Sequence, residues 1–416
     1  MKNVVRAVIA IAMLVPLTTL GSQPSSAAAC RIIYHPDGWK TIRPPSNEFE
    51  IHGQAIDPSN PRRIFIHDDK VVYRSDDGGC SWAESWTNTW VGVGPYTPEI
   101  RHIAVQGQRV YVLAYGLQRD DCPDCNPAFH VIYSDRGGAP ASWKLSKGLP
   151  LAGSEIIDPP IKGIDIAPSN PRVLYIGFRG TAAPTSTIYR SSDGAETWER
   201  TEDPASLIER AQDPGMRNLG YSFVIDPSNP RTLWALGGPF STEASQSLYR
   251  SKDAGATWDL VKVFPWQISH VRVGGNGKDA WVLAVSNQTP GFVRLYLSAN
   301  SGQNFHAFHG PLRYESSLFN NVSTIVRDEV FFGYGGRTPA AVRIHLAKER
   351  WALVKDGNRF PTPGFDTGSI STSSNGSLLS LRTEMGIHQS KVKRVFGKGR
   401  LEPVTLRPCD ENPKCV

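Results

Sequence analysis

The amino-acid sequence predicts an all-β fold, a seven-bladed β-propeller whose blades are four-stranded antiparallel sheets and whose ring is closed by an N-terminal strand. Three observations lead to this prediction. Turn formers and strand-favouring aromatic residues are abundant, with 38 Gly, 32 Pro, 11 Trp, 13 Tyr and 16 Phe among 416 residues. Two short motifs recur along the chain. Each repeated unit holds four short strands, and because one such sheet cannot bury both of its faces alone, the units must pack radially.

The first motif is a turn of the form Ser-x-Asp-x-Gly/Ala-x-Thr/Ser-Trp, which we call the box turn. It reads SDDGGCSW at 75–82, SSDGAETW at 191–198 and SKDAGATW at 251–258, with degenerate copies at 134–143 and 298–305. A short carboxylate can accept hydrogen bonds from its own turn, glycine permits a positive φ, and the aromatic ring packs between neighbouring sheets. Structural roles are therefore predicted for Asp77, Trp82, Asp193, Trp198, Asp253 and Trp258.

The second motif precedes the three well-kept box turns. It reads IDPSNPRRIFI at 56–66, IAPSNPRVLYI at 166–176 and IDPSNPRTLWA at 225–235. Proline and asparagine favour a tight connection, and the flanking runs are rich in β-branched and aromatic residues. The two motifs together give one unit of strand, PSNP turn, strand, loop, strand, box turn and strand.

Counting the aromatic residue that ends each unit gives six blades. A seventh blade is predicted over 365–404, where the box turn is lost, and YHPDGWKTI at 34–42 is expected to supply a displaced outer strand. Six blades with a separate tail is the alternative. The six aromatic residues are Trp82, Trp143, Trp198, Trp258, Phe305 and Trp351.

The N-terminus has the features of an export signal, because Lys2 and Arg6 precede an apolar run that ends in small residues. That run is shorter than the roughly 20 apolar residues needed to span a bilayer. The sequence therefore predicts a signal peptide at 1–29, a propeller at 30–408 and a short disulfide-linked tail at 409–416. A secreted or extracytoplasmic monomer without a membrane span is expected, with lipid attachment at Cys30 as the minor alternative.

Six cysteines in an exported chain favour disulfides. The CPDC sequence lies in a polar loop between strand-like runs, which disfavours a redox motif at the start of a helix. The sequence predicts no metal site, no cofactor and no nucleic-acid partner, since the formal net charge is only +6. The expected pairs are Cys122 with Cys125, Cys409 with Cys415, and Cys30 with Cys80.

Over residues 46–405, the two motifs together resemble the Asp-box, or bacterial neuraminidase repeat, propellers. That superfamily includes sialidases, xyloglucanases, sortilin-type receptors and photosystem II assembly factors, so the resemblance implies the fold and leaves several activities open. A typical sialidase is disfavoured, because the expected Phe/Tyr-Arg-Ile-Pro motif is replaced by Thr-Ile-Arg-Pro at 41–44. Xyloglucanases pair two propellers around a cleft, whereas this chain has the length of one.

Functional residues are expected opposite the box turns, where the first strand of each blade begins at the mouth of the central channel. A glycoside hydrolase needs two carboxylates about 5 to 9 Å apart, and the candidates are Glu50, Glu99 and Asp366. Aromatic rings in the links between blades either stack on a sugar or fill the wedge between neighbouring blades. Ligand-binding candidates are Arg101, Arg217, Tyr221, His270, Trp86 and Trp90.

The sequence favours a propeller that binds a glycan, or an extracellular or periplasmic protein, at the channel mouth. A glycoside hydrolase that uses the paired carboxylates is the first alternative. An extracytoplasmic assembly factor, whose basic channel holds an acidic segment of its partner, is the second.

Overall fold

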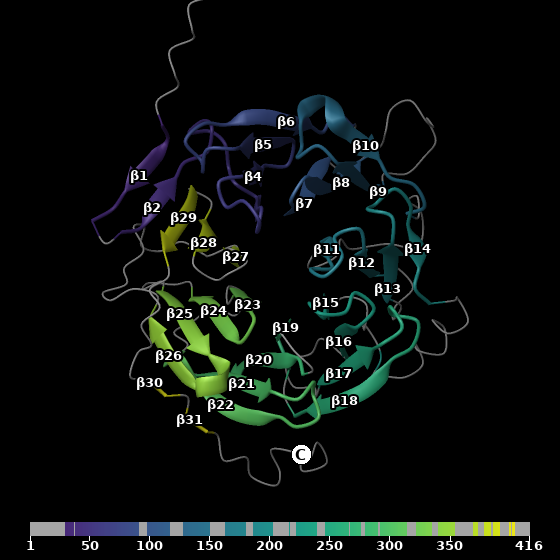
Figure 1. The fold of residues 1–416 in the computed structure, drawn as a ribbon, viewed down its shortest axis with the longest axis vertical. Coiled ribbons are helices and arrows are strands. Elements are labelled where there is room, and N and C mark those ends of the chain that lie inside the picture. Colours follow the sequence, from purple (N-terminus) through teal and green to yellow (C-terminus); the bar gives the residue numbers. More distant parts are fainter. Residues whose placement is uncertain are drawn as a thin grey trace, which may run out of the picture.

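The computed structural model describes residues 30–36, 38–90, 98–116, 128–149, 163–179, 186–202, 216, 222–238, 246–265, 267–275, 279–289, 292–313, 322–334, 340–353, 369–372, 378–383, 386–391, 399–400 and 402–403. These residues form seven antiparallel sheets arranged around a central axis, as Figure 1 shows. The predicted all-β, seven-bladed propeller is therefore confirmed, and the six-blade alternative is excluded. No helix in the described part of the chain is long and apolar enough to cross a bilayer.

Blades 1 to 4 follow the chain in order, each with its first strand innermost. Their strands alternate in direction, and buried apolar residues fill the space between neighbouring blades. Blade 1 contains β3 (Gly53–Ile56), β4 (Ile64–His67), β5 (Val71–Ser75) and β6 (Ala83–Thr87); blade 2 contains β7 (Glu99–Gln106), β8 (Arg109–Gly116), β9 (Ala128–Ser134), the short helix η1 (Pro140–Ser142) and β10 (Trp143–Leu145); blade 3 contains β11 (Asp165–Ile166), β12 (Leu174–Arg179), β13 (Ser186–Ser191) and β14 (Glu199–Arg200); blade 4 contains β15 (Ser222–Ile225), β16 (Leu233–Gly237), β17 (Gln246–Ser251) and β18 (Asp259–Phe264).

Blades 5 to 7 complete the ring, and two of them gain a fifth strand from the C-terminal part of the chain. Blade 5 contains β19 (His270–Gly274), β20 (Trp281–Thr289), β21 (Phe292–Ser298), β22 (His306–Arg313) and, at its outer edge, β31 (Glu402–Pro403); blade 6 contains β23 (Val322–Val326), β24 (Glu329–Tyr334), β25 (Ala340–His345), the short helix η2 (Leu346–Lys348), β26 (Arg350–Leu353) and β30 (Gly399–Arg400); blade 7 contains β27 (Ser369–Thr372), β28 (Leu378–Thr383) and β29 (Gly386–Lys391). The segment predicted as blade 7 alone therefore also edges blades 5 and 6.

The N-terminal segment closes the ring as predicted. Strand β2 (Lys40–Ile42) is the outer strand of blade 7 and pairs antiparallel with β29, with Ile42 opposite Ile387. Strand β1 (Ile32–Tyr34) adds a fifth strand outside β2. A disulfide joins Cys30, just before β1, to Cys80 in the box turn of blade 1. Blade 7 and blade 1 are therefore linked by backbone pairing and by a covalent bond.

The box turns and the PSNP turns lie together on one face of the ring. In blade 1, Gly78 N donates to Arg62 O at 2.8 Å, and the same bond recurs in blade 3 between Gly194 N and Arg172 O at 2.8 Å. Because successive strands reverse direction, the opposite face carries the start of each first strand, the loop between the second and third strands, and the connections between blades. We call this opposite face the link face.

Each well-kept box turn is closed by its aspartate. Asp77 accepts a hydrogen bond from Cys80 N at 2.9 Å and from the Ser81 hydroxyl at 2.6 Å. Asp193 and Asp253 accept the corresponding bond from a threonine hydroxyl, also at 2.6 Å. These hydrogen bonds hold the pKa of Asp77 at about 2, against the opposing effect of burial.

The degenerate box turns keep the shape with other groups. In blade 5, Asn300 Oδ1 accepts from Asn304 N at 3.0 Å. In blade 2, Arg136 stands where the aspartate would be, and the Ser134 hydroxyl accepts from Gly138 N at 3.0 Å. A carboxylate is therefore not required for the turn to form.

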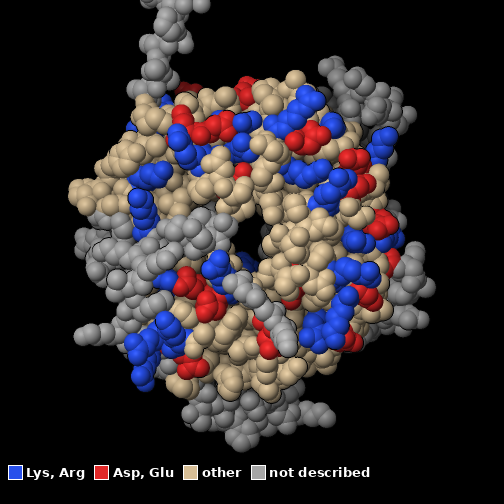
Figure 2. All heavy atoms as spheres, viewed as in Figure 1, with Lys and Arg blue, Asp and Glu red and all other residues tan. Residues whose placement is uncertain are grey.

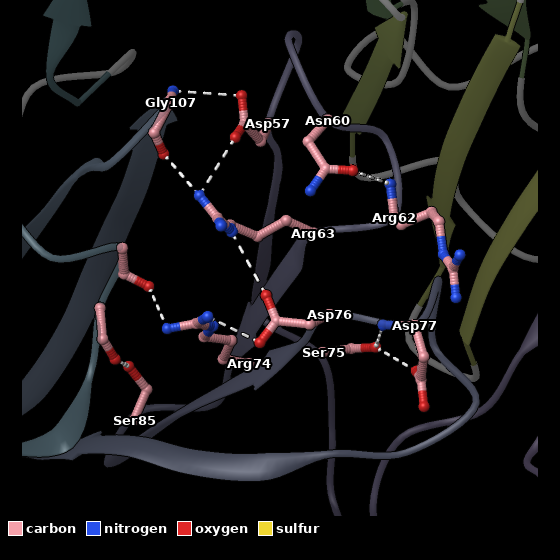
Figure 3. A network of polar contacts seen from close by, with 12 residues as sticks. Asp57, Asn60, Arg62, Arg63, Arg74, Ser75, Asp76, Asp77, Ser85 and Gly107 are labelled. Atoms are coloured by element: carbon pink, nitrogen blue, oxygen red, sulfur yellow. Dashed lines mark hydrogen bonds and ion pairs between the residues drawn. The ribbon is translucent and has the colours of Figure 1, made fainter.

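Polar side chains of blades 1 to 4 also hold the turns of the next blade, as Figure 3 shows for blade 1. Gly107, in the turn between β7 and β8, donates to Asp57 at 3.1 Å and accepts from Arg63 at 3.0 Å, both from blade 1. Arg74 donates to Gly137 O in the box turn of blade 2 at 2.7 Å. Equivalent bonds between blades are made by Arg109 to Gly194, Tyr111 to Pro171, Tyr175 to Pro230 and Arg250 to Ser301. The face of the box turns is thus used to join blades.

Candidate functional site

Five charged or titratable side chains meet on the link face between blades 1 and 2, and we call them the blade 1–2 cluster. Glu50 and His52 lie just before β3, and Asp69 lies in the loop between β4 and β5. Glu99 and Arg101 begin β7. Ile100 N donates to Asp69 O at 2.7 Å, which fixes the loop of blade 1 against the first strand of blade 2.

His52 lies between two carboxylates of the cluster. Its Nδ1 is 2.6 Å from Asp69 Oδ1, and its Nε2 is 3.6 Å from Glu50 Oε2. Arg101 forms an ion pair with Glu99, and its side chain is 41% exposed. The cluster therefore presents hydrogen-bond donors and acceptors to a ligand on the link face.

The two carboxyl groups on either side of the blade boundary differ in environment. The Glu99 side chain is 20% exposed, whereas that of Asp69 is 58% exposed. Burial raises the pKa of Glu99, Arg101 opposes this rise, and the nearby Asp69 carboxylate adds to it. A raised pKa favours the protonated form of Glu99, and a carboxyl group in that form can serve as a proton donor.

Two half-buried tryptophans adjoin the cluster. The Trp90 ring centroid is 4.6 Å from that of His130 and 6.1 Å from that of Trp86. Gly116 lies close to both Trp90 and Pro98, and Pro98 directly precedes Glu99. Both tryptophans pack on the core between blades 1 and 2, so they fill the wedge and also keep part of their surface exposed.

The link between blades is tied to the cluster by the backbone. Asn88 N donates to Lys70 O at 2.7 Å, next to Asp69. The Asn88 side chain accepts a hydrogen bond from Trp90 N at 3.1 Å. These bonds tie the link that carries the aromatic pair to the loop that carries Asp69.

The predicted site residues divide into three sets. Glu50, Glu99 and Arg101 come together in the cluster, with Trp86 and Trp90 beside it. His270 lies at the start of β19 in blade 5, where its Nε2 is 2.7 Å from the Ser323 hydroxyl. The other predicted residues, Asp366, Arg217, Tyr221, Cys122, Cys125, Cys409 and Cys415, lie outside the described residues.

His52 and Asp69 were not among the predicted site residues. Asp69 belongs to a loop between the second and third strands, and such loops emerge on the same face as the start of the first strands. Applying that rule to all the loops of the repeat would have found it. Within the described ranges, no three His, Cys, Asp or Glu side chains are grouped to hold a metal ion.

Comparisons with known proteins find partial sequence similarity between this chain and two xyloglucanases. No family model matches it. A xyloglucanase of Acetivibrio thermocellus is 33% identical over 109 residues, which is 25% of this chain and 12% of that protein. A xyloglucanase of a Paenibacillus species is 35% identical over 101 residues, or 23% of this chain and 9% of that protein. The matches thus span a small part of these relatives.

Two solved structures have a similar fold over most of this chain. The GH74 xyloglucanase of Xanthomonas campestris superposes with a TM-score of 0.58 at 17% identity, over 88% of this chain and 55% of that one. An ancestral GH74 enzyme gives a TM-score of 0.54 at 13% identity, over 85% of this chain and 49% of that one. The seven blades and these similarities show that the chain shares the β-propeller fold of these solved structures, and its recurring box turns are consistent with the Asp-box type of propeller.

Proposed function

We propose that this protein is an exported glycan-binding propeller whose ligand lies on the link face across the blade 1–2 cluster. The observation that carries the proposal is that charged hydrogen-bonding groups lie beside a half-buried tryptophan pair at the same blade boundary. Sugar hydroxyls require such donors and acceptors, and sugar rings stack on aromatic faces. The sequence similarity to xyloglucanases and the disulfide support a glycan ligand and export.

Binding to a panel of oligosaccharides tests the proposal, with xyloglucan and cello-oligosaccharides as the first probes and isothermal titration as the readout. We expect Trp90→Ala and Arg101→Ala each to weaken binding by about tenfold or more, the loss of one stacking or charged contact. Tyr34→Ala is the aromatic control, because Tyr34 lies on β1 with 75% of its surface exposed. Equal affinity in all four proteins would refute the site.

Hydrolysis of the bound glycan is a second candidate function, favoured by the different environments of Glu99 and Asp69. Protonated Glu99 would donate its proton to the leaving glycosidic oxygen as the bond to the anomeric carbon breaks. Asp69, hydrogen-bonded to His52, would accept a proton from the water whose oxygen bonds to that carbon. Glu50, on the other side of His52, would help to hold the ring in place.

The release of reducing ends over a pH series tests hydrolysis separately from binding. We expect Glu99→Gln to lower turnover about a hundredfold or more while binding is kept, because the amide has no proton to donate. On the alkaline side, turnover should fall as the pH rises through the raised pKa of Glu99, because Glu99 then loses the proton that it donates. Wild-type protein that binds the glycan but releases no reducing ends would leave binding as the function.

A further inference from the structure

A second group of polar side chains lies on the link-face side of the channel, away from the blade 1–2 cluster. His270 and Arg272 alternate along β19, the inner strand of blade 5, so both side chains lie on the same side of that strand. Ser323 is on β23, the inner strand of blade 6. Arg272 Nε donates to Ser323 O at 2.8 Å, and the Ser323 hydroxyl is 2.7 Å from His270 Nε2. The three residues therefore form one group across two blades.

Arg272 is largely buried, and no carboxylate of the described residues is paired with it. Among the described residues, no ion pair within 4.0 Å involves Arg272. Arg63 and Arg343 are also largely buried, and they are paired with Asp57 and Glu329. Burial lowers the pKa of Arg272 to about 10, and Asp165 of blade 3 counteracts this only as a nearby charge.

An unpaired charge in such a position is costly to the folded protein. Desolvation of a guanidinium is offset only when an anion or several hydrogen bonds replace the lost water. Two of the five N–H groups of Arg272 donate hydrogen bonds to the backbone carbonyls of Ser323 and Val271. Its remaining donors and its charge suit a small anionic group.

We propose that Arg272, His270 and Ser323 form an anion-binding site in the channel, which takes a carboxylate or a phosphate group. His270 is the first residue of β19, as Glu99 is of β7, so Arg272 lies about 7 Å inside the link face at roughly 3.3 Å per residue. Figure 2 shows Lys or Arg side chains beside the central opening. The central opening of the ring, visible in the same view, gives an anion a route into the channel.

The anion site does not depend on the proposed glycan function. If an acidic sugar is the ligand, its carboxylate would enter the channel while its ring stays on the link face. If the ligand is inorganic phosphate, it would occupy the channel alone. Titrations with oligogalacturonate, inorganic phosphate and a neutral galacto-oligosaccharide separate these two sources.

The test compares these titrations in wild-type protein, Arg272→Gln, Arg272→Lys and His270→Gln, with Arg250→Gln as control. Arg250 donates to Ser301 O on the opposite face, so its replacement leaves the channel unchanged. We expect Arg272→Gln to weaken binding of the anion about tenfold to a hundredfold, in line with the loss of hydrogen bonds to a charged group. Arg272→Lys should lose less because it keeps the charge, and binding should weaken with added salt.

Thermal unfolding distinguishes a binding role from a structural one. With no anion present, Arg272→Gln should unfold at the wild-type temperature or above it, because it removes an uncompensated buried charge. Adding the anion should raise the unfolding temperature of the wild type and not that of Arg272→Gln. The proposal is overturned if the wild type binds no anion, or if all channel variants bind it equally. Loss of glycan binding in Trp90→Ala tests the proposed function and not the anion site.

Discussion

At the scale of single residues, the box aspartates matter for acid stability. The pKa of Asp77 is about 2, and those of Asp193 and Asp253 are lowered by the same kinds of hydrogen bond. A carboxyl group whose pKa is lowered by folding contributes stability above its unfolded pKa, near 3.8, and loses that contribution as the pH falls toward 2. The propeller should therefore weaken steeply below about pH 4.

Replacing Asp77 by alanine should lower the free energy of unfolding by about 2 kcal/mol at pH 7 and by less at pH 3. At pH 7 the ionised Asp77 carboxylate accepts the hydrogen bonds of the box turn, and the variant loses them. At pH 3 part of their stabilising effect is already lost in the wild type, so the variant loses less. Asp135→Ala is the matched control: Asp135 lies in the box turn of blade 2 but pairs with Lys144 at the surface, so it should cost less than about 1 kcal/mol. Denaturant unfolding at both pH values measures the difference, and equal losses in the two variants would contradict the assignment.

The site was only partly predictable from single residues. Glu99 and Arg101 could be placed because they begin a first strand, whose direction follows from the repeat. No motif marks His52 or Asp69, although the repeat predicts that the loop carrying Asp69 lies on the link face. The meeting of these side chains with Glu99 depends on the approach of blade 1 to blade 2, through bonds such as that from Ile100 N to Asp69 O, which local sequence does not specify.

At the scale of elements, the closing strand β2 rests under the box turn of blade 1. Gly79 has φ of +93°, and a Cβ there would lie 2.1 Å from Ile42 Cγ2. Ile42 is fully buried. The glycine is therefore required both by the turn and by the close approach of the closing strand.

Gly79→Ala should cost at least about 2 kcal/mol, because strain at a positive φ adds to the clash with Ile42. Gly107→Ala is the comparison, since Gly107 also has a positive φ, +61°, but a Cβ there would meet nothing within 4 Å. It should cost only about 1 kcal/mol. Unfolding temperatures of the two variants provide the measurement; a smaller loss for Gly79→Ala would show that β2 shifts without cost.

The strands of the blades that carry both motifs could be predicted from the sequence, whereas the short strands at the outer edges of blades 5 and 6 could not. The PSNP and box motifs mark the turns of blades 1, 3 and 4, where the structure has four strands each. Strands β30 and β31 have two residues each, too few for an alternating pattern. Their place on blades 6 and 5 is decided by the edges that β26 and β22 present to them.

At the scale of the whole molecule, the stability of the ring depends on the contacts that join blade 7 to blade 1. Blade 7 takes its outer strands from the N-terminus, and the disulfide joins the same segment to blade 1. Loss of either link exposes the boundary between the first and last blades. In a closed ring that boundary is where unfolding can begin.

Cys30→Ser should lower the free energy of unfolding by about 2 to 4 kcal/mol, because the disulfide closes a segment of 50 residues in the unfolded chain. Hydrogen exchange should speed up in β1, β2 and β29 more than in β15–β18 on the far side of the ring (Figure 1). Cys80→Ser is the control and should give the same pattern. Uniform acceleration in all blades would show that the bond does not act on the closure.

The disulfide also bears on the order in which the molecule can be assembled. Strand β2 must wait for β29, since Ile42 pairs with Ile387 near the other end of the chain. Cys30 and Cys80, by contrast, both emerge during synthesis before the residues of blades 2 to 6 and before β27, β28 and β29 of blade 7. Once bonded, they hold the N-terminal segment beside blade 1 while five further blades form. The last blade then arrives at an edge already in position, which shortens the search for closure.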